Sequence, residues 1–272
     1  MTESSNTKTI VLINGLWLTA LSWEHWAERY RARGFKVVAR SWPGMEGDIE
    51  TLRQDTSKID HIGVGEVVEH YEGIIRGLDE APIIIGHSFG GLVTQILLDH
   101  GLGVAGVALD PAPVKGILAL PWSTLKSSFP VLKNPANNHR AVPLSPEEFH
   151  YAFTNTLDDA ASLRIYQRYA VPGPGRVLFQ GALANFNPHA TTRVNFANDD
   201  RAPLLLIVGG SDHVSPPAIA RSNAKLQHRS KALTAYKEFP GRPHFILGNP
   251  GWEEVADFAL DWALDPQPLS DS

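Results

Sequence analysis

Residues 82–93 have the sequence PIIIGHSFGGLV, in which a β-branched run leads through a glycine-rich turn into a second apolar run. The turn at residues 86–90 fits the pattern G-x-S-x-G. This pattern is typical of a sharp turn from a strand into a helix, which projects a serine hydroxyl beyond the end of a sheet. Small residues are required there because the serine adopts a strained backbone and the strand and helix come close together. Ser88 is therefore the candidate nucleophile.

Other short β-branched runs predict further strands. Most of them are apolar at both alternating positions, as expected of parallel strands covered by helices on both faces. Segments with helical periodicity lie between them, for example at residues 23–30 and 67–78. This alternation predicts an α/β fold with a doubly wound, mostly parallel sheet of about six strands. We expect the strands at residues 9–13, 35–39, 82–85, 104–109, 204–208 and 233–236.

Residues 111–201 interrupt the alternation. They are rich in Pro, Asn, Ser and aromatic residues and contain one good helical stretch, near residues 158–169. We therefore expect a core made of residues 1–110 and 202–272 and an insertion made of residues 111–201. The aromatic residues of the insertion fit two roles equally well, an apolar substrate pocket or a small core of the insertion itself. They are Trp122, Phe129, Phe149, Tyr151, Phe153, Tyr166 and Phe196.

The composition excludes several classes of protein. A chain of 272 residues with 43% apolar residues can bury a sizeable core. The formal net charge is −5, without a basic block of the kind that nucleic acids or anionic membranes select, so neither partner is expected. The absence of cysteine excludes disulfides, thiolate metal sites and cysteine nucleophiles. No histidine pair has the spacing of a metal site, and we expect no metal and no cofactor.

Targeting signals are also missing from the sequence. Residues 1–8 do not have a basic segment followed by an apolar one, so we expect no secretory signal and a cytoplasmic location. The apolar stretch at residues 104–120 is interrupted by Asp110, Lys115, prolines and glycines, so no membrane span is expected. The oligomeric state does not follow from the sequence.

With these features the chain resembles enzymes of the α/β-hydrolase fold, from Thr7 to Leu264. In that family an acid and then a histidine follow the serine along the chain. Residues 204–216, LLLIVGGSDHVSP, resemble the family's strand-G-x-x-D-x-x-x-P segment, which implies that Asp212 is the acid. Asp212 also fits a second role, as the N-cap of a helix that begins near Pro216. Asp110, at the end of another predicted strand, is the alternative acid, because some members place it there.

The resemblance also implies the histidine. His244 lies in GRPHF, residues 241–245, which matches the family's G-x-x-H turn between the last strand and the last helix. A lone histidine is more often a surface or capping residue, so only the geometry can decide its role. His87, inside the glycine-rich turn, is expected to pack against or orient its neighbours.

The family's oxyanion hole consists of two backbone N–H groups. The matching donors here are Phe89, directly after the candidate nucleophile, and Leu16, in the loop after the first strand. That loop, residues 14–17, reads NGLW where the family usually has His-Gly-x. Asn14 replaces the histidine and can also bond the backbone, although it can reshape the pocket. Trp17 is expected either to face the pocket or to belong to the core.

The resemblance implies a carboxylesterase-like serine hydrolase that binds a small-molecule substrate, expected to be an apolar ester. It would cleave a carboxylic ester, a lactone or a thioester through an acyl-serine intermediate. The same three residues serve hydroxynitrile lyases, carbon–carbon bond hydrolases and perhydrolases of this fold, and the sequence does not separate these reactions. A third alternative, of another class, is a non-catalytic small-molecule receptor on the same fold. The insertion falls where family members carry a cap over the active site.

Overall fold

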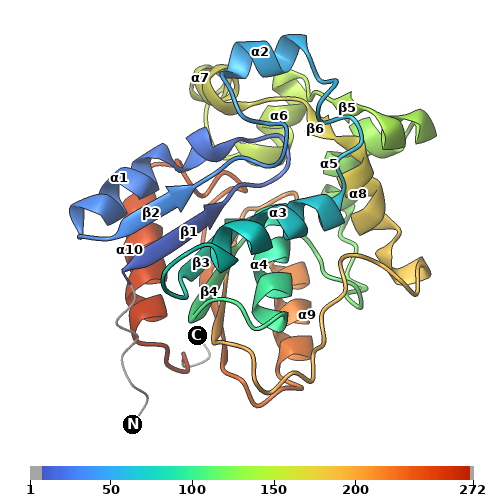
Figure 1. Cartoon of the computed structure of the whole chain (residues 1–272). Coiled ribbons are helices and arrows are strands. Elements are labelled where there is room, and N and C mark those ends of the chain that lie inside the picture. Colours follow the sequence, from blue (N-terminus) through green and yellow to red (C-terminus); the bar gives the residue numbers. More distant parts are fainter. Residues whose placement is uncertain (1–7, 270–272) are drawn as a thin grey trace.

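The computed structural model describes residues 8–269. In this part of the chain six strands form one sheet, in the order β2-β1-β3-β4-β7-β8, and every neighbouring pair is parallel (Figure 1). The doubly wound parallel sheet predicted from the sequence is confirmed. The strands are β1 (Thr9–Ile13), β2 (Lys36–Ala39), β3 (Ile83–His87), β4 (Ala105–Leu109), β7 (Leu204–Gly209) and β8 (Thr234–Phe239).

The four central strands β1, β3, β4 and β7 are buried along their whole length, because helices cover both faces of the sheet. One face carries α1 (Glu24–Ala32) and α10 (Trp252–Leu264), which are joined by a hydrogen bond from the Tyr30 hydroxyl to the Ala256 carbonyl. The other face carries α3 (Val64–Arg76), α4 (Phe89–Asp99) and α9 (Pro217–Gln227).

The strand order indicates at which end of the sheet a ligand would bind. From β1 the chain moves outward to β2, and it then returns to the opposite side of β1 to form β3. In an open parallel sheet, such a reversal leaves a crevice at the carboxyl ends of the two central strands, where ligands usually bind. Here those ends lead into the loop at residues 14–17 and into Ser88.

The chain between β4 and β7 lies over this end of the sheet (Figure 1). It contains more regular structure than the single helical stretch expected from the sequence. A short antiparallel pair, β5 (Ala141–Val142) and β6 (Gly173–Pro174), accompanies the helices. The helices are α5 (Trp122–Leu132), α6 (Pro146–Phe153), α7 (Asp159–Tyr169) and α8 (Gly175–Ala182), with the 3₁₀ turns η2 (Pro135–His139) and η3 (Ala184–Phe186).

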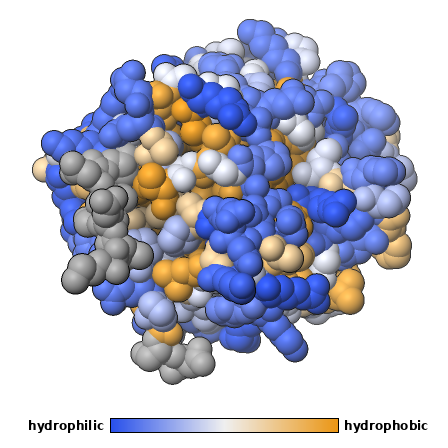
Figure 2. Space-filling view, turned by 60° about the horizontal axis from the view of Figure 1, so that its bottom comes forward, coloured by the Kyte–Doolittle hydropathy of each residue, from blue (hydrophilic) through white to orange (hydrophobic). Residues whose placement is uncertain are grey.

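Two further elements flank the sheet, the 3₁₀ turn η1 (Ala20–Trp23) and the helix α2 (Ile49–Gln54). On the face shown in Figure 2 hydrophilic residues predominate, and hydrophobic ones form separate patches between them. Within residues 8–269 no helix combines the length and apolarity needed to cross a membrane. The expectation of no secretory signal concerns residues 1–8, and all of these except Lys8 lie outside the described residues. The division into a core and a cap at residues 111–201 stays a prediction.

Candidate active site

Ser88 lies between β3 and α4 in a strained backbone conformation, with φ 55° and ψ −120°. Backbone hydrogen bonds hold it there: its N–H donates to the Leu109 carbonyl at 2.9 Å, and its carbonyl accepts from the Ala112 N–H at 3.0 Å. A Cβ on Gly86 would lie 2.1 Å from the Gly90 carbonyl oxygen. The glycines of the turn are therefore required by close packing, as the sequence pattern predicts.

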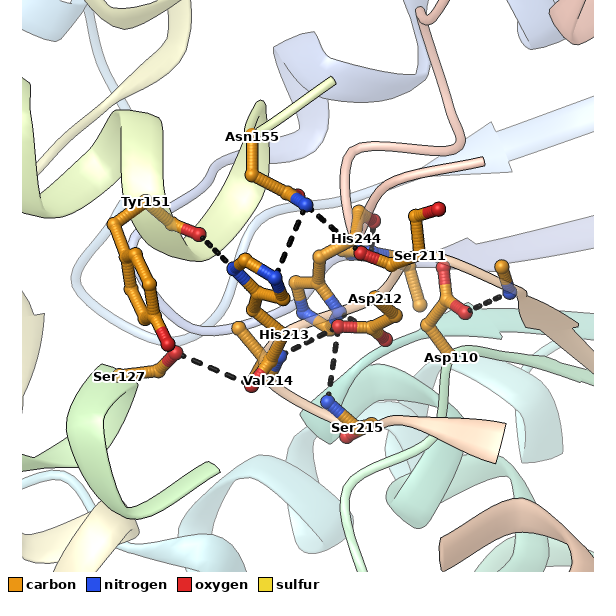
Figure 3. A network of polar contacts seen from close by, with 12 residues as sticks. Asp110, Ser127, Tyr151, Asn155, Ser211, Asp212, His213, Val214, Ser215 and His244 are labelled. Carbon is orange, nitrogen blue, oxygen red and sulfur yellow. Dashed lines mark hydrogen bonds and ion pairs between the residues drawn. The ribbon is translucent and has the colours of Figure 1, made fainter. Parts of the chain in front are cut away.

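His244 and Asp212 form a buried pair in the described part of the chain. His244 Nδ1 lies 2.8 Å from Asp212 Oδ2, and neither side chain is exposed (Figure 3). A carboxylate can only accept, so Nδ1 carries the proton and donates it. The second ring nitrogen, Nε2, is then a free acceptor, and it is buried without a hydrogen-bond partner among the described residues. This is the nitrogen that a general base would use.

The carboxylate of Asp212 is held by its own turn. Its Oδ1 accepts from the Val214 N–H at 2.6 Å and from the Ser215 N–H at 3.0 Å (Figure 3). The alternative role as a helix N-cap does not apply, because α9 begins at Pro217 and its N-cap residue is Pro216. The two backbone bonds leave Oδ2 to face His244.

Asp110, the alternative acid, is fully buried at the end of β4. Its Oδ1 accepts from the Gly209 N–H at 2.6 Å, and its Oδ2 has no hydrogen-bond partner among the described residues. Burial and the nearby Asp212 carboxylate raise the pKa of Asp110 well above its ordinary value of 3.8. The structure thus brings both acids to the same place, with Asp212 bonded to His244 and Asp110 beside the pair (Figure 3).

His87 lies on the other side of His244, with the two ring centroids 4.7 Å apart. Its Nε2 is 2.8 Å from the carbonyl oxygen of His244 and donates to it. Burial and the neighbouring His244 lower the pKa of His87 well below its ordinary value of 6.5, so this ring is neutral. The neighbour of the candidate nucleophile therefore supports the backbone of the candidate base.

One group of potential metal ligands is present among the described residues. His87, Asp110 and His244 each offer an atom within 4.8 Å of the others. No local sequence pattern indicates this group, because its members lie at or after the ends of three different strands. His87 Nε2 and His244 Nδ1 are already engaged in hydrogen bonds within the protein.

The loop at residues 14–17 is organised by Asn14. Its side-chain Nδ2 donates to the Leu18 carbonyl at 2.7 Å and to the Gly15 carbonyl at 3.1 Å, which is the backbone bonding expected of asparagine here. The loop lies directly against the turn, because a Cβ on Gly15 would meet Ser88 Cβ at 2.8 Å. The backbone N–H groups of Leu16 and Phe89, the candidate oxyanion donors, have no hydrogen-bond partner within residues 8–269.

Trp17 joins this loop to the segment above it. Its φ of 66° lies in the left-handed region, and its indole Nε1 donates to the Val142 carbonyl at 2.9 Å. Its own carbonyl accepts from the Val171 N–H, also at 2.9 Å. Trp17 is buried, and it also lines a small cavity of about 20 Å³ with Leu144, Phe149, Tyr166 and Pro172. Trp17 thus belongs to the core, and its expected place in the substrate pocket stays a prediction.

Residues of the segment 111–201 contact the acid turn through polar groups for which the sequence suggested no role. Asn155 Nδ2 donates to the Ser211 carbonyl at 3.0 Å and lies 3.3 Å from His213 Nε2 (Figure 3). His213 Nδ1 lies 2.9 Å from the Tyr151 carbonyl, and Ser127 Oγ donates to the His213 carbonyl at 3.2 Å. These contacts join residues far apart in the chain, so no local pattern could have indicated them.

Comparison with known proteins identifies the protein family. A model of the alpha/beta hydrolase family matches residues 10–258, and the chain belongs to this family. Comparison with curated proteins finds no match. Solved structures share the fold at low sequence identity. The monoacylglycerol lipase of Paleococcus ferrophilus is 23% identical with a TM-score of 0.66, covering 94% of this chain and 93% of its own.

Two further solved structures are similar to the same extent. An extracellular alpha/beta-hydrolase from a Paenibacillus species is 19% identical with a TM-score of 0.67, and the alignment covers 93% of this chain and 98% of that one. A pyrethroid hydrolase from Sphingobium faniae JZ-2 is 17% identical with a TM-score of 0.64, and the alignment covers 96% and 99%. At these identities the likeness concerns the fold.

Proposed function

We propose that the chain is a serine hydrolase that cleaves a carboxylic ester, with Ser88, His244 and Asp212 as its catalytic residues. One observation carries the proposal. The buried pair of His244 and Asp212 leaves Nε2 as a free acceptor, and the centroid of the His244 ring lies 4.7 Å from that of His87, the residue before Ser88 in the strained turn. In ligand-free sites the bond from nucleophile to base is often long and tightens only when substrate binds.

In the proposed reaction, His244 Nε2 takes the proton of Ser88 Oγ while Oγ bonds to the ester carbonyl carbon. The N–H groups of Leu16 and Phe89 donate to the oxyanion that develops, and the start of α4 adds a favourable potential. His244 then gives its proton to the departing alkoxide, which leaves an acyl group on Ser88. A water molecule activated by the same nitrogen releases the acid and restores the serine. Asp212 stabilises the charged imidazole in both steps.

An apolar ester suits the surroundings of this site. The segment at residues 111–201, which we propose as the cap, places Phe153 next to His244 and Trp17, and Phe149 stacks on Phe153. Two of the similar structures are named for activities on substrates of this class, a monoacylglycerol lipase and a pyrethroid hydrolase.

The test combines active-site labelling with an ester panel. The unaltered protein should react with a fluorophosphonate probe and hydrolyse p-nitrophenyl esters, and Ser88→Ala should do neither. Ser222→Ala, at a serine on the outer helix α9, is the matched control and should keep both properties. Hydrolysis by Ser88→Ala at the unaltered rate would refute the serine mechanism. A folded protein that takes no label and cleaves no ester would favour a binding role.

A further inference from the structure

Helix α5 turns its large apolar side chains outward. Trp122, Leu125 and Phe129 are 76%, 40% and 63% exposed, and their spacing of three and four residues places them on one face. The other side of the helix buries one apolar residue, Val131, and Ser127, whose hydroxyl bonds to the backbone of the acid turn. A helix that only packs on a core shows the reverse arrangement. The outward face of α5 is therefore not explained by the fold.

The exposed apolar face continues onto adjacent segments. The Asn185 side chain accepts from the Gly116 N–H at 2.7 Å and donates to the Ile117 carbonyl at 2.8 Å, which brings η3 next to the segment before α5. Most of the exposed large apolar side chains in the described chain belong to these segments. We call them the outer cap surface: Leu118, Leu120, Trp122, Leu125, Phe129, Leu183 and Phe186.

The stretch of chain that contains α5 has an excess of positive charge. Residues 111–146 contain four basic residues, Lys115, Lys126, Lys133 and Arg140, and no Asp or Glu. The sequence expectation of no anionic surface partner rested on the net charge of the whole chain, −5, and on the absence of a basic block; the four basic residues are spread along the segment and do not form such a block. A partner of this region should therefore combine negative charge with apolar contact area.

We propose that the outer cap surface docks on an anionic lipid surface. A helix with exposed Trp, Leu and Phe and with flanking lysines is suited to lie in the plane of such an interface. Tryptophan favours the boundary between headgroups and acyl chains, and each lysine near the headgroups adds attraction. A second copy of this chain fits less well, because a symmetric contact would bring Lys126 and Lys133 of both copies together.

The test is flotation of the full-length protein with vesicles of phosphatidylcholine alone or mixed equally with phosphatidylglycerol. We expect binding to the mixed vesicles that weakens at high salt. The double variant Trp122→Ser/Phe129→Ser should bind these vesicles at least tenfold more weakly. The double variant Lys126→Gln/Lys133→Gln should lose most of the binding that depends on salt concentration. Leu163→Ser, at an apolar residue of α7 that is 42% exposed, is the matched control and should bind normally.

Three outcomes would overturn the docking proposal. They are no binding to mixed vesicles, equal binding to both kinds of vesicle, and self-association in solution that Trp122→Ser abolishes while vesicles are not bound. Circular dichroism of each variant would verify that it is folded. Binding is measured without turnover, and Ser88→Ala should bind like the unaltered protein. A failure of the proposed ester hydrolysis would therefore leave this result unaffected.

Discussion

The ring of Phe153 meets the ring of His244 edge-on, with the centroids 4.9 Å apart. Phe153 is the last residue of α6, and its carbonyl accepts from the Phe245 N–H at 2.8 Å. Both its ring and its backbone therefore contact the turn that carries His244. An apolar ring in this place keeps water from the imidazole and strengthens its interaction with Asp212. The segment above the sheet is thus a wall of the proposed active site as well as its cover.

Replacing Asp212 by asparagine tests the proposed acid. The amide keeps the size of the side chain but cannot stabilise a charged imidazole or fix its tautomer, so kcat should fall by about 10³ to 10⁴-fold. Steady-state kinetics with a p-nitrophenyl ester measures this. Asp110→Asn should lower kcat far less. A larger loss in Asp110→Asn than in Asp212→Asn would assign the acid to β4 instead.

Asp110 should make stability depend on pH in a recognisable direction. Because its pKa in the folded state is raised above the ordinary value of 3.8, the protein is favoured while the group is protonated and loses stability as the pH rises from about 4. The amide side chain of the Asp110→Asn variant cannot ionise. The free energy of unfolding of this variant should therefore rise relative to that of the unaltered protein between pH 4 and 8. Urea unfolding measures the difference, with the exposed Asp200→Asn as control. A constant difference across this range would contradict the burial argument.

His87 should make stability depend on pH in the direction opposite to that of Asp110. Its pKa in the folded state is lowered, so its contribution to stability is complete above 6.5 and is lost as the pH falls below that value. His87→Gln keeps an amide that can donate to the His244 carbonyl but does not titrate. The loss of stability between pH 6.5 and 5 should therefore be shallower in the variant, as measured by urea unfolding. Parallel curves for the two proteins would show that His87 is not the group responsible.

Trp17→Phe tests the connection between the loop at residues 14–17 and the cap. The variant keeps an aromatic ring but removes the hydrogen bond from the indole to the Val142 carbonyl, which should cost about 1 kcal/mol of stability. If this bond also positions the Leu16 N–H, kcat should fall about tenfold with little change in KM. Trp252→Phe is the matched control for the loss of an indole, since the Trp252 ring stacks on that of Trp26. Unchanged kcat in Trp17→Phe would limit this bond to a structural role.

Gly90→Ala tests the packing behind the serine turn. A Cβ there would lie 2.2 Å from the Ile13 carbonyl oxygen, so the strand and helix must move apart, and we expect a loss of more than about 3 kcal/mol. Gly73→Ala, in α3, is the matched control because a Cβ there meets nothing within 4 Å. That substitution should stabilise the helix by roughly 0.5–1 kcal/mol. Thermal unfolding would distinguish the two, and similar melting temperatures would contradict the steric argument.

The sheet could be predicted from sequence because its central strands are continuous apolar runs, and only strands covered on both faces have that composition. Edge strands were also found. Strand β8 extends to Phe239, beyond the expected residue 236, because the consecutive charged residues Lys237 and Glu238 end the apolar run that predicts the strand. The serine turn was visible for a steric reason: close packing restricts positions 86 and 90 to glycine.

The cap was harder to predict. Helix α5 has an apolar stripe that faces outward and a proline inside it, Pro130, so its pattern does not identify a buried face. The contacts of Asn155 and Phe153 with the acid and histidine turns join residues 56 or more positions apart. Such contacts depend on the folded arrangement of several segments, which short patterns do not encode.

The two bonds of Trp17 to Val142 and Val171 matter for anyone who wishes to exchange substrate preference by grafting a foreign cap onto this sheet. The turn that holds Leu16 is anchored partly in the piece that would be exchanged. A chimera that lacks these two anchoring positions would inherit a new pocket together with a loosened turn at the proposed oxyanion donor. Selectivity and rate would then change together, and the anchors would have to be transplanted first.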